Sequence, residues 1–148
     1  MTYLQFKIGG ACYAMATAAV EAVVAAVPLR PCPGAPDWLP GWLPYQGGVV
    51  PVADLTRRLT GQPSQLRLST RILLIPHSRP DGGGGRFGLL AEGVTDTLTC
   101  APARFSVSPP GAAAFPWLGP LASMEGEMVQ LIYPERFLPP EVDAALFA

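Results

Sequence analysis

The sequence of 148 residues is poor in charged side chains, which make up 14% of the chain against 49% for hydrophobic residues. Ten basic and eleven acidic residues leave a formal net charge of −1, and the basic residues form no cluster. Proteins that bind nucleic acid present a basic surface to the phosphates. The sequence therefore predicts no nucleic-acid partner, and its apolar composition excludes a disordered chain.

Metal-ligating side chains are also few. The chain has three cysteines and a single histidine, His77, and no two cysteines form a Cys-x-x-Cys pair. Zinc sites need closely spaced ligands, and disulfide frameworks use an even set of cysteines. We therefore expect reduced, structural thiols at Cys12, Cys32 and Cys100, with no bound metal and no cofactor.

Long apolar segments are missing. The longest, residues 18–27, is interrupted by Glu21 and has about half the length that a membrane-spanning helix needs. The first residues alternate in polarity and lack a charged start followed by an apolar stretch, so they predict no signal peptide. We expect a cytoplasmic protein that does not insert directly into a membrane.

Reactive side chains form no recognisable catalytic motif. His77 borders a glycine-rich stretch, residues 77–85, which lacks the Gly-Lys-Ser or Gly-Lys-Thr of a phosphate-binding loop and indicates an exposed, flexible turn. The serines occur in no nucleophile elbow, and the aspartates are scattered. The sequence thus predicts a protein that is not an enzyme, with catalysis through His77 as the alternative.

Glycine and proline, in contrast, are abundant, with 16 and 18 residues. They punctuate about ten short segments with strand character, a pattern that suits small β-barrels. A length of 148 residues fits one domain, or two small lobes that share a core. The expected strands span residues 3–8, 12–15, 24–29, 49–52, 71–75, 86–91, 94–100, 118–124 and 128–133.

Short helices are expected at three places. Thr17 is a candidate N-cap, and Val20, Val23 and Val24 would share one face of a helix that gives way to a strand near Val24. A second helix should follow Asp54, and a third should begin at Pro140, because proline suits the first turn of a helix.

Residues 41–55 are the most informative stretch. They read Gly-Trp-Leu-Pro-Tyr-Gln-Gly-Gly-Val-Val-Pro-Val-Ala-Asp-Leu. A turn leads into a strand that contains Pro51, which cannot donate to a ladder, so we expect an edge strand or a bulge. Asp54 can cap the amides of Thr56 or Arg57, and Gly61 suits the exit of the helix.

Several segments, taken in order, resemble the CheW-like domain family, the coupling proteins of bacterial chemosensory arrays. The match covers nearly the whole chain, and the order and spacing of its parts are more specific than any one part. The parts are Tyr3-Leu4-Gln5-Phe6-Lys7-Ile8-Gly9-Gly10, Val20-Glu21, Pro36-Asp37-Trp38-Leu39-Pro40-Gly41, Val50-Pro51-Val52-Ala53-Asp54-Leu55, Phe87-Gly88-Leu89-Leu90-Ala91-Glu92-Gly93-Val94 and the ending from Glu127 to Leu138.

The resemblance implies a mainly β fold. Residues 1–148 would form one CheW-like domain, in which two interleaved SH3-like five-stranded β-barrels share a hydrophobic core and carry a few short helices. It also implies an adaptor that bridges the regulatory domain of a chemotaxis-type (CheA-like) histidine kinase and the cytoplasmic tip of a methyl-accepting chemoreceptor. A coupler with only one working face is a variant of this interpretation.

The family positions proposed to face the receptor correspond to Val20, Gly41, Gln46 and Gly93. An apolar Val20 can bury against a receptor helix, and the two glycines allow backbone to come close. The alternative is that Val20 belongs to the core and that both glycines serve only turns.

Gln46 departs from the family pattern. The family usually reads Asn-Leu-Arg-Gly here, whereas this chain reads Pro44-Tyr45-Gln46-Gly47. The planar guanidinium, which suits carboxylates, is replaced by a neutral amide. Either the receptor has compensated for this change, or the protein does not hold the family's usual receptor. A specialised system that controls surface motility, pili or a second messenger is one such option. An SH3-like module that binds peptides or forms oligomers outside chemosensory signalling is the alternative function.

Overall fold

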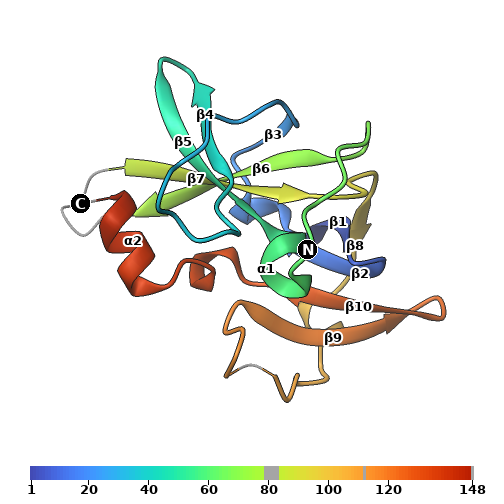
Figure 1. Ribbon diagram of the computed structural model, residues 1–148. Coiled ribbons are helices and arrows are strands. Elements are labelled where there is room, and N and C mark those ends of the chain that lie inside the picture. The colour runs from blue at the N-terminus through green and yellow to red at the C-terminus, as the bar shows by residue number, and fades with distance from the viewer. Residues whose placement is uncertain (79–83, 112, 148) are drawn as a thin grey trace. The chain divides into compact units, whose positions relative to one another are not determined.

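Two five-stranded sheets make up most of the secondary structure (Figure 1). The structure is a computed structural model that describes residues 1–78, 84–111 and 113–147. The chain divides into two units: unit 1 comprises Met1–Ala19 and Thr95–Ala148, and unit 2 comprises Val20–Val94. The prediction of a mainly β fold with few short helices is confirmed.

Unit 1 is built on a sheet with the strand order β8-β1-β2-β10-β9. Its neighbours are antiparallel except for β2 and β10, which are parallel. A tight turn at Gly9 and Gly10, both with positive φ, joins the first two strands, because such a turn matches the twist of a hairpin. The strands are β1 (Thr2–Ile8), β2 (Ala11–Ala16), β8 (Thr97–Thr99), β9 (Leu118–Met124) and β10 (Glu127–Ile132).

Aromatic packing marks the core of unit 1. The rings of Tyr3 and Phe105 lie with their centroids 5.0 Å apart, and both side chains belong to a buried cluster with Ala14, Ala122 and Val129. Tyr3 is therefore buried, although it is out of phase with Phe6 and Ile8, which are also buried. Both faces of β1 therefore carry buried side chains, Tyr3 on one and Phe6 and Ile8 on the other. A half-buried strand would bury side chains on only one face.

Two buried phenols give unit 1 a predicted pH dependence. Burial raises the pKa of Tyr3, and burial likewise raises that of Tyr13, from the ordinary value of 10.0. In alkali the unfolded chain loses these protons first, so the stability present below about pH 10 should be lost as the pH rises through the raised values. Urea denaturation between about pH 9 and 11 should show a flatter decline for Tyr3→Phe than for the wild type. An unchanged slope would contradict this, and Tyr45→Phe, at a half-buried position in unit 2, is the control.

Unit 2 is built on a sheet with the order β3-β6-β7-β5-β4. Here β5 and β7 are the parallel pair. The buried cluster on one face consists of Leu43, Val50, Val52, Ile72, Leu74 and Leu90. The strands are β3 (Ala22–Ala25), β4 (Gly41–Tyr45), β5 (Gly48–Asp54), β6 (Arg71–Ser78) and β7 (Gly84–Ala91).

The prediction that Pro51 marks an edge strand or a bulge is wrong, because β5 lies between β4 and β7. Pro51 is opposite Trp42, and both backbone polar groups of Trp42 bond to Arg30 on the far side of β4. The nitrogen of Pro51 therefore points away from β4, since paired positions of an antiparallel ladder alternate. On its other side the pairing with β7 runs from Val52 to Asp54, so the missing donor interrupts neither ladder.

Two further predictions need correction. The helix expected after Thr17 is only a 3₁₀ turn, Thr17–Ala19, and Val23 and Val24 lie in β3. The hydroxyl of Thr17 donates to the carbonyl of Thr2 instead of capping a helix. Residues 41–45, where no strand was predicted, form strand β4, and the predicted turn before the Pro51 strand consists of Gln46 and Gly47.

The other helices follow the predictions. Helix α1 (Leu55–Thr60) has Asp54 as its N-cap and Gly61, in the left-handed conformation, as its C-cap. Helix α2 (Pro140–Leu146) begins at the predicted proline. Short 3₁₀ turns cover Pro102–Arg104 and Pro134–Arg136. Within the described ranges, no helix combines the length and the apolar character that crossing a membrane requires.

Strands β6 and β7 extend into the glycine-rich stretch that was predicted to be a turn. His77 lies in β6 and pairs with Gly85 of β7, so both ends of residues 77–85 belong to strands. The remaining part of the predicted turn, residues 79–83, lies outside the described residues.

Candidate partner-binding site

The four positions matched to the receptor-facing residues, Val20, Gly41, Gln46 and Gly93, all belong to unit 2. Strands β3, β5 and β7 run in one direction, and β4 and β6 run in the other. Val20 precedes β3 and Gln46 lies between β4 and β5, so both are at one end of the sheet. Gly41 begins β4 and Gly93 follows β7, so these two are at the opposite end. The structure therefore divides the four positions between the two ends of the sheet, and the strand order places β3 and β4 at its opposite edges.

Val20 is half-buried in the short connection between the 3₁₀ turn and β3. The next residue, Glu21, donates its backbone N–H to the carbonyl of Leu74 over 2.8 Å. This bond anchors the start of β3 to β6. Val20 thus keeps part of its apolar side chain accessible on a fixed backbone.

Gln46 is exposed at the tip of the β4–β5 hairpin. Its φ is 48° and that of Gly47 is 78°, the left-handed pair of a two-residue hairpin turn. Left-handed backbone is tolerated by few residues other than glycine. The tip is therefore a two-residue turn in which Gln46 is exposed.

Arg86 contacts Glu21, the residue after Val20, and Tyr45, the residue before Gln46. Its Nε donates to Glu21 Oε2, and its guanidinium carbon lies 5.7 Å from the centroid of the Tyr45 ring. The side chains of Arg86 and Glu21 are 39% and 36% exposed, respectively. Sequence analysis missed this residue, because only the strand register brings β7 beside both the start of β3 and the tip of β4.

Gly41 is buried, and a side chain there would meet the chain itself. A Cβ built on Gly41 would lie 2.1 Å from the carbonyl oxygen of Arg30. Arg30 and Trp42 exchange backbone hydrogen bonds of 3.0 and 2.8 Å, which fix this approach. The absence of a side chain at Gly41 is thus explained without a partner.

Gly93 has a φ of 59° and is half-buried after the end of β7. The residues on either side are tied to α1 and to the connector that follows it. Glu92 Oε1 accepts from the N–H of Gln65 at 3.0 Å and from the hydroxyl of Thr56 at 3.3 Å. Val94 donates its N–H to the carbonyl of Ser69 over 2.9 Å. The bend at Gly93 is therefore part of a local hydrogen-bond network.

Asp54 organises the segment between β5 and β6. Its Oδ1 accepts from the N–H of Arg57 at 3.2 Å and from the hydroxyl of Ser64 at 2.6 Å, and its Oδ2 accepts from the N–H of Ser64 at 2.9 Å. The predicted cap is confirmed, and the same buried carboxylate also fixes the connector. Asp54 is thus a structural residue.

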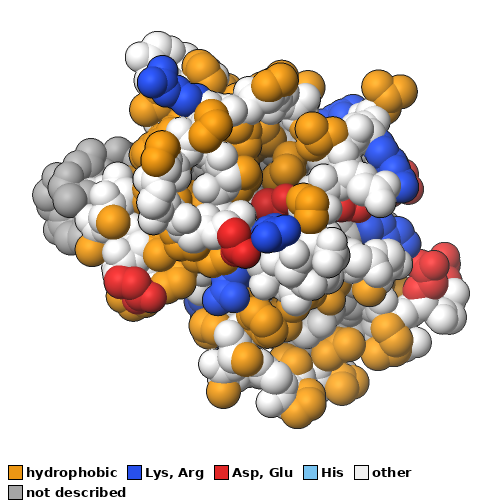
Figure 2. Space-filling view, in the orientation of Figure 1, with side chains coloured by type: hydrophobic (Ala, Val, Ile, Leu, Met, Phe, Trp, Pro, Cys, Tyr) orange, Lys and Arg blue, Asp and Glu red, His pale blue; other side chains and the backbone are white. Residues whose placement is uncertain are grey.

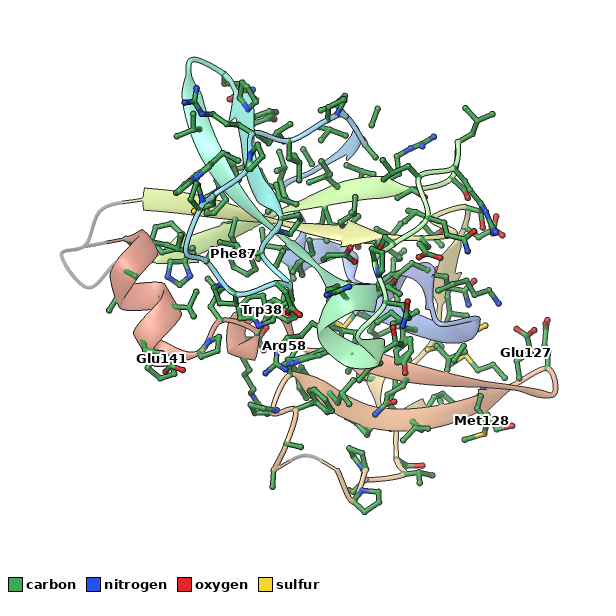
Figure 3. The ribbon with its side chains drawn as sticks, viewed as in Figure 1. Trp38, Arg58, Phe87, Glu127, Met128 and Glu141 are labelled. Atoms are coloured by element: carbon green, nitrogen blue, oxygen red, sulfur yellow. The ribbon has the colours of Figure 1, made fainter. Side chains whose placement is uncertain are left out.

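Loop residues before β4 dock on α1. The backbone N–H of Asp54 donates to the carbonyl of Trp38 at 2.7 Å. Figure 3 shows the side chains of Trp38 and Arg58 beside each other at this helix, with the guanidinium carbon 5.4 Å from the centroid of the indole ring. The loop therefore has a defined path into Gly41.

The chemistry offered by the described residues is limited. No group of three or more His, Cys, Asp or Glu side chains within them could hold a metal ion. The ring of His77 makes an edge contact with Phe87, with centroids 5.9 Å apart. Cys12, Cys32 and Cys100 are free thiols. Lys7 Nζ donates to Cys12 Sγ at 2.9 Å, and this bond raises the pKa of Lys7.

The surface agrees with the composition. On the face drawn in Figure 2, Lys and Arg side chains are scattered, several of them beside Asp or Glu side chains, and form no continuous basic area. Exposed apolar side chains include Val49, next to the β4–β5 tip, which is 66% exposed.

Comparison with known proteins places the chain in a family. The family model of the CheW-like domain matches residues 2–141. Among solved structures, the chain is similar to the scaffolding protein TtCheW from Thermoanaerobacter tengcongensis, with a TM-score of 0.75 and 19% identity over 88% of this chain and 82% of that chain. Comparison with curated proteins gives no significant match. Since the family match spans nearly all residues and the fold agrees with it, the chain belongs to the CheW-like domain family.

Proposed function

We propose that the protein is a non-catalytic, cytoplasmic adaptor that couples a chemotaxis-type histidine kinase to the cytoplasmic tip of a methyl-accepting chemoreceptor. The observation that carries this proposal is the match of the CheW-like family to residues 2–141. The solved relative is itself described as a scaffolding protein. Under this proposal, residues 1–148 act as one CheW-like domain.

The receptor contact is assigned to the end of unit 2 that carries Val20 and Gln46. Val20 offers a partly exposed apolar side chain beside the backbone bond that anchors β3, and Gln46 is exposed in a two-residue turn. A receptor helix can bury an apolar residue against such a surface. Gly93 lies at the other end of the sheet. The carbonyl of Arg30 leaves no room for a side chain at Gly41, so this glycine needs no partner to explain it. We assign neither residue a direct contact.

Val20→Asp should weaken binding to the receptor by roughly tenfold or more, because a charge at an apolar contact loses burial energy and is desolvated. Isothermal titration with a soluble receptor-tip hairpin measures this affinity. Val107→Asp, at a position in unit 1 that is 54% exposed, is the matched control. Equal receptor affinity for both variants would remove Val20 from the interface.

The neutral Gln46 supports a system with an unusual receptor. Losing one partner of a buried charge pair commonly costs about 2–5 kcal/mol, so a receptor that relies on such a pair would be bound poorly. Gln46→Arg should therefore change the affinity for a receptor tip, and an unchanged affinity would remove the argument for a specialised system controlling motility, pili or a second messenger.

Co-purification with the kinase regulatory domain separates the adaptor from the alternative. Binding to that domain favours chemosensory signalling. Absence of binding, together with self-association or binding to unrelated peptides, would favour an SH3-like module with another role.

A further inference from the structure

Arg86 holds its guanidinium at the end of unit 2 that carries Val20 and Gln46. It is the third residue of β7, whose start lies at the same end of the sheet as the start of β3 and the β4–β5 turn. Its two contacts, Glu21 and Tyr45, directly follow Val20 and directly precede Gln46 in the sequence. Arg86 therefore lies between the two candidate contact positions.

Contacts with Glu21 and Tyr45 orient the Arg86 guanidinium, but they do not engage all of its N–H donors. Nε donates to Glu21, and the Tyr45 ring lies 5.7 Å from the guanidinium carbon. An arginine has five N–H donors in a rigid fork, and the bond to Glu21 employs the one on Nε. With the side chain 39% exposed, its terminal amino groups can meet an approaching carboxylate with two parallel hydrogen bonds.

The pair of contacts also lowers the cost of binding. A free arginine side chain loses rotamer freedom when it is immobilised in an interface. Here an acidic neighbour and an aromatic ring already restrict it, so less of that entropy is lost. Glu21 reduces the net charge of this site, which limits nonspecific attraction and leaves recognition to the planar geometry of the fork.

We propose that Arg86 is a specificity-determining contact for the receptor, where it binds an Asp or Glu side chain that lies beside an apolar residue on the receptor helix. Val20 packs against the apolar residue, and the Arg86 guanidinium donates hydrogen bonds to the carboxylate. This inference rests on the proposed function, and it assigns the cationic contact of this surface to β7, whereas the turn supplies only the amide of Gln46.

Receptor affinity tests the inference directly. The probe is a soluble coiled-coil hairpin that carries the cytoplasmic tip of a methyl-accepting receptor from the same organism. Arg86→Ala should weaken its binding roughly tenfold or more, and Arg86→Lys, which keeps the charge but loses the fork, should recover only part of the loss. The salt dependence of binding should be smaller for Arg86→Ala than for the wild type, because an ionic contact is screened.

Matched measurements separate the inference from misfolding and from the proposed function. Arg104→Ala removes the same charge from unit 1 and should leave receptor affinity unchanged. Arg86→Met keeps the aliphatic stem, and its thermal unfolding and its affinity for the kinase regulatory domain should equal those of the wild type while receptor binding falls. Receptor affinity of Arg86→Met equal to that of the wild type would overturn the inference alone. A wild-type chain that binds neither the kinase domain nor the receptor would overturn the proposed function and the inference together.

Discussion

Replacing Gly41 with alanine should lower the free energy of unfolding by roughly 2–4 kcal/mol, at or above the usual cost of overpacking. The new Cβ would lie 2.1 Å from the carbonyl oxygen of Arg30 and 2.8 Å from its carbonyl carbon. Both atoms belong to the backbone, so no side-chain rotation relieves the clash. The Arg30–Trp42 pair would have to separate, with loss of its two hydrogen bonds. Chemical denaturation measures the change.

The control for Gly41 is Gly48→Ala. Gly48 lies in the same hairpin, and its added Cβ would come no closer than 3.7 Å to the carbonyl oxygen of Tyr45. Its free energy of unfolding should change by no more than about 0.5 kcal/mol. If Gly41→Ala were as stable as the wild type but bound the receptor poorly, Gly41 would be a contact residue, contrary to our interpretation.

Removing the carboxylate of Asp54 should also cost roughly 2–4 kcal/mol, the sum of a lost helix cap and of buried donors left without a partner. Asp54→Ala deprives the N–H of Arg57 and both the N–H and the hydroxyl of Ser64 of their acceptor. The side chain is buried, so water does not replace these bonds freely. Hydrogen exchange should show α1 and residues 61–70 becoming unprotected before the strands of unit 2.

Two variants bracket the effect at Asp54. Asp54→Asn keeps an acceptor oxygen for the cap and should retain part of the stability. Asp37→Ala removes an ion pair with Arg57 whose carboxylate is 68% exposed, so it should cost less than about 1 kcal/mol. Equal losses for Asp54→Ala and Asp37→Ala would show that the buried network contributes little.

Local signals in the sequence predicted the elements that local chemistry decides. The cap at Asp54, the exit at Gly61 and the turn at Gly9 and Gly10 depend on side chains and dihedral angles within a few residues. The tail helix at Pro140 belongs to the same class. Such features need no information about distant strands.

Nonlocal pairing explains the errors. Pro51 is tolerated in an interior strand because neither ladder needs a hydrogen-bond donor at its nitrogen. In the β4–β5 ladder this nitrogen points away from β4, and the pairing of β5 with β7 begins only at Val52. Neither register can be read from the segment itself. The valines after Thr17 have a helical spacing, but pairing of β3 with β6 overrides it.

The candidate site was predictable in part. The four matched positions all fall in unit 2, yet the sequence could not show that Val20 and Gln46 share one end of the sheet. Nor could it show that the carbonyl of Arg30 leaves no room for a side chain at Gly41. The contacts of Arg86 with Glu21 and Tyr45 could not be predicted either. Each of these facts depends on which strands are neighbours.

The most direct test of the account is a three-component binding experiment. The purified protein is titrated into the kinase regulatory domain and the receptor-tip hairpin, separately and together, and the complexes are sized by analytical ultracentrifugation. The account predicts that each partner binds on its own and that all three components sediment as one complex. Binding of the two partners in competition with each other, or binding of neither, would contradict the claim that this chain couples a kinase to a receptor.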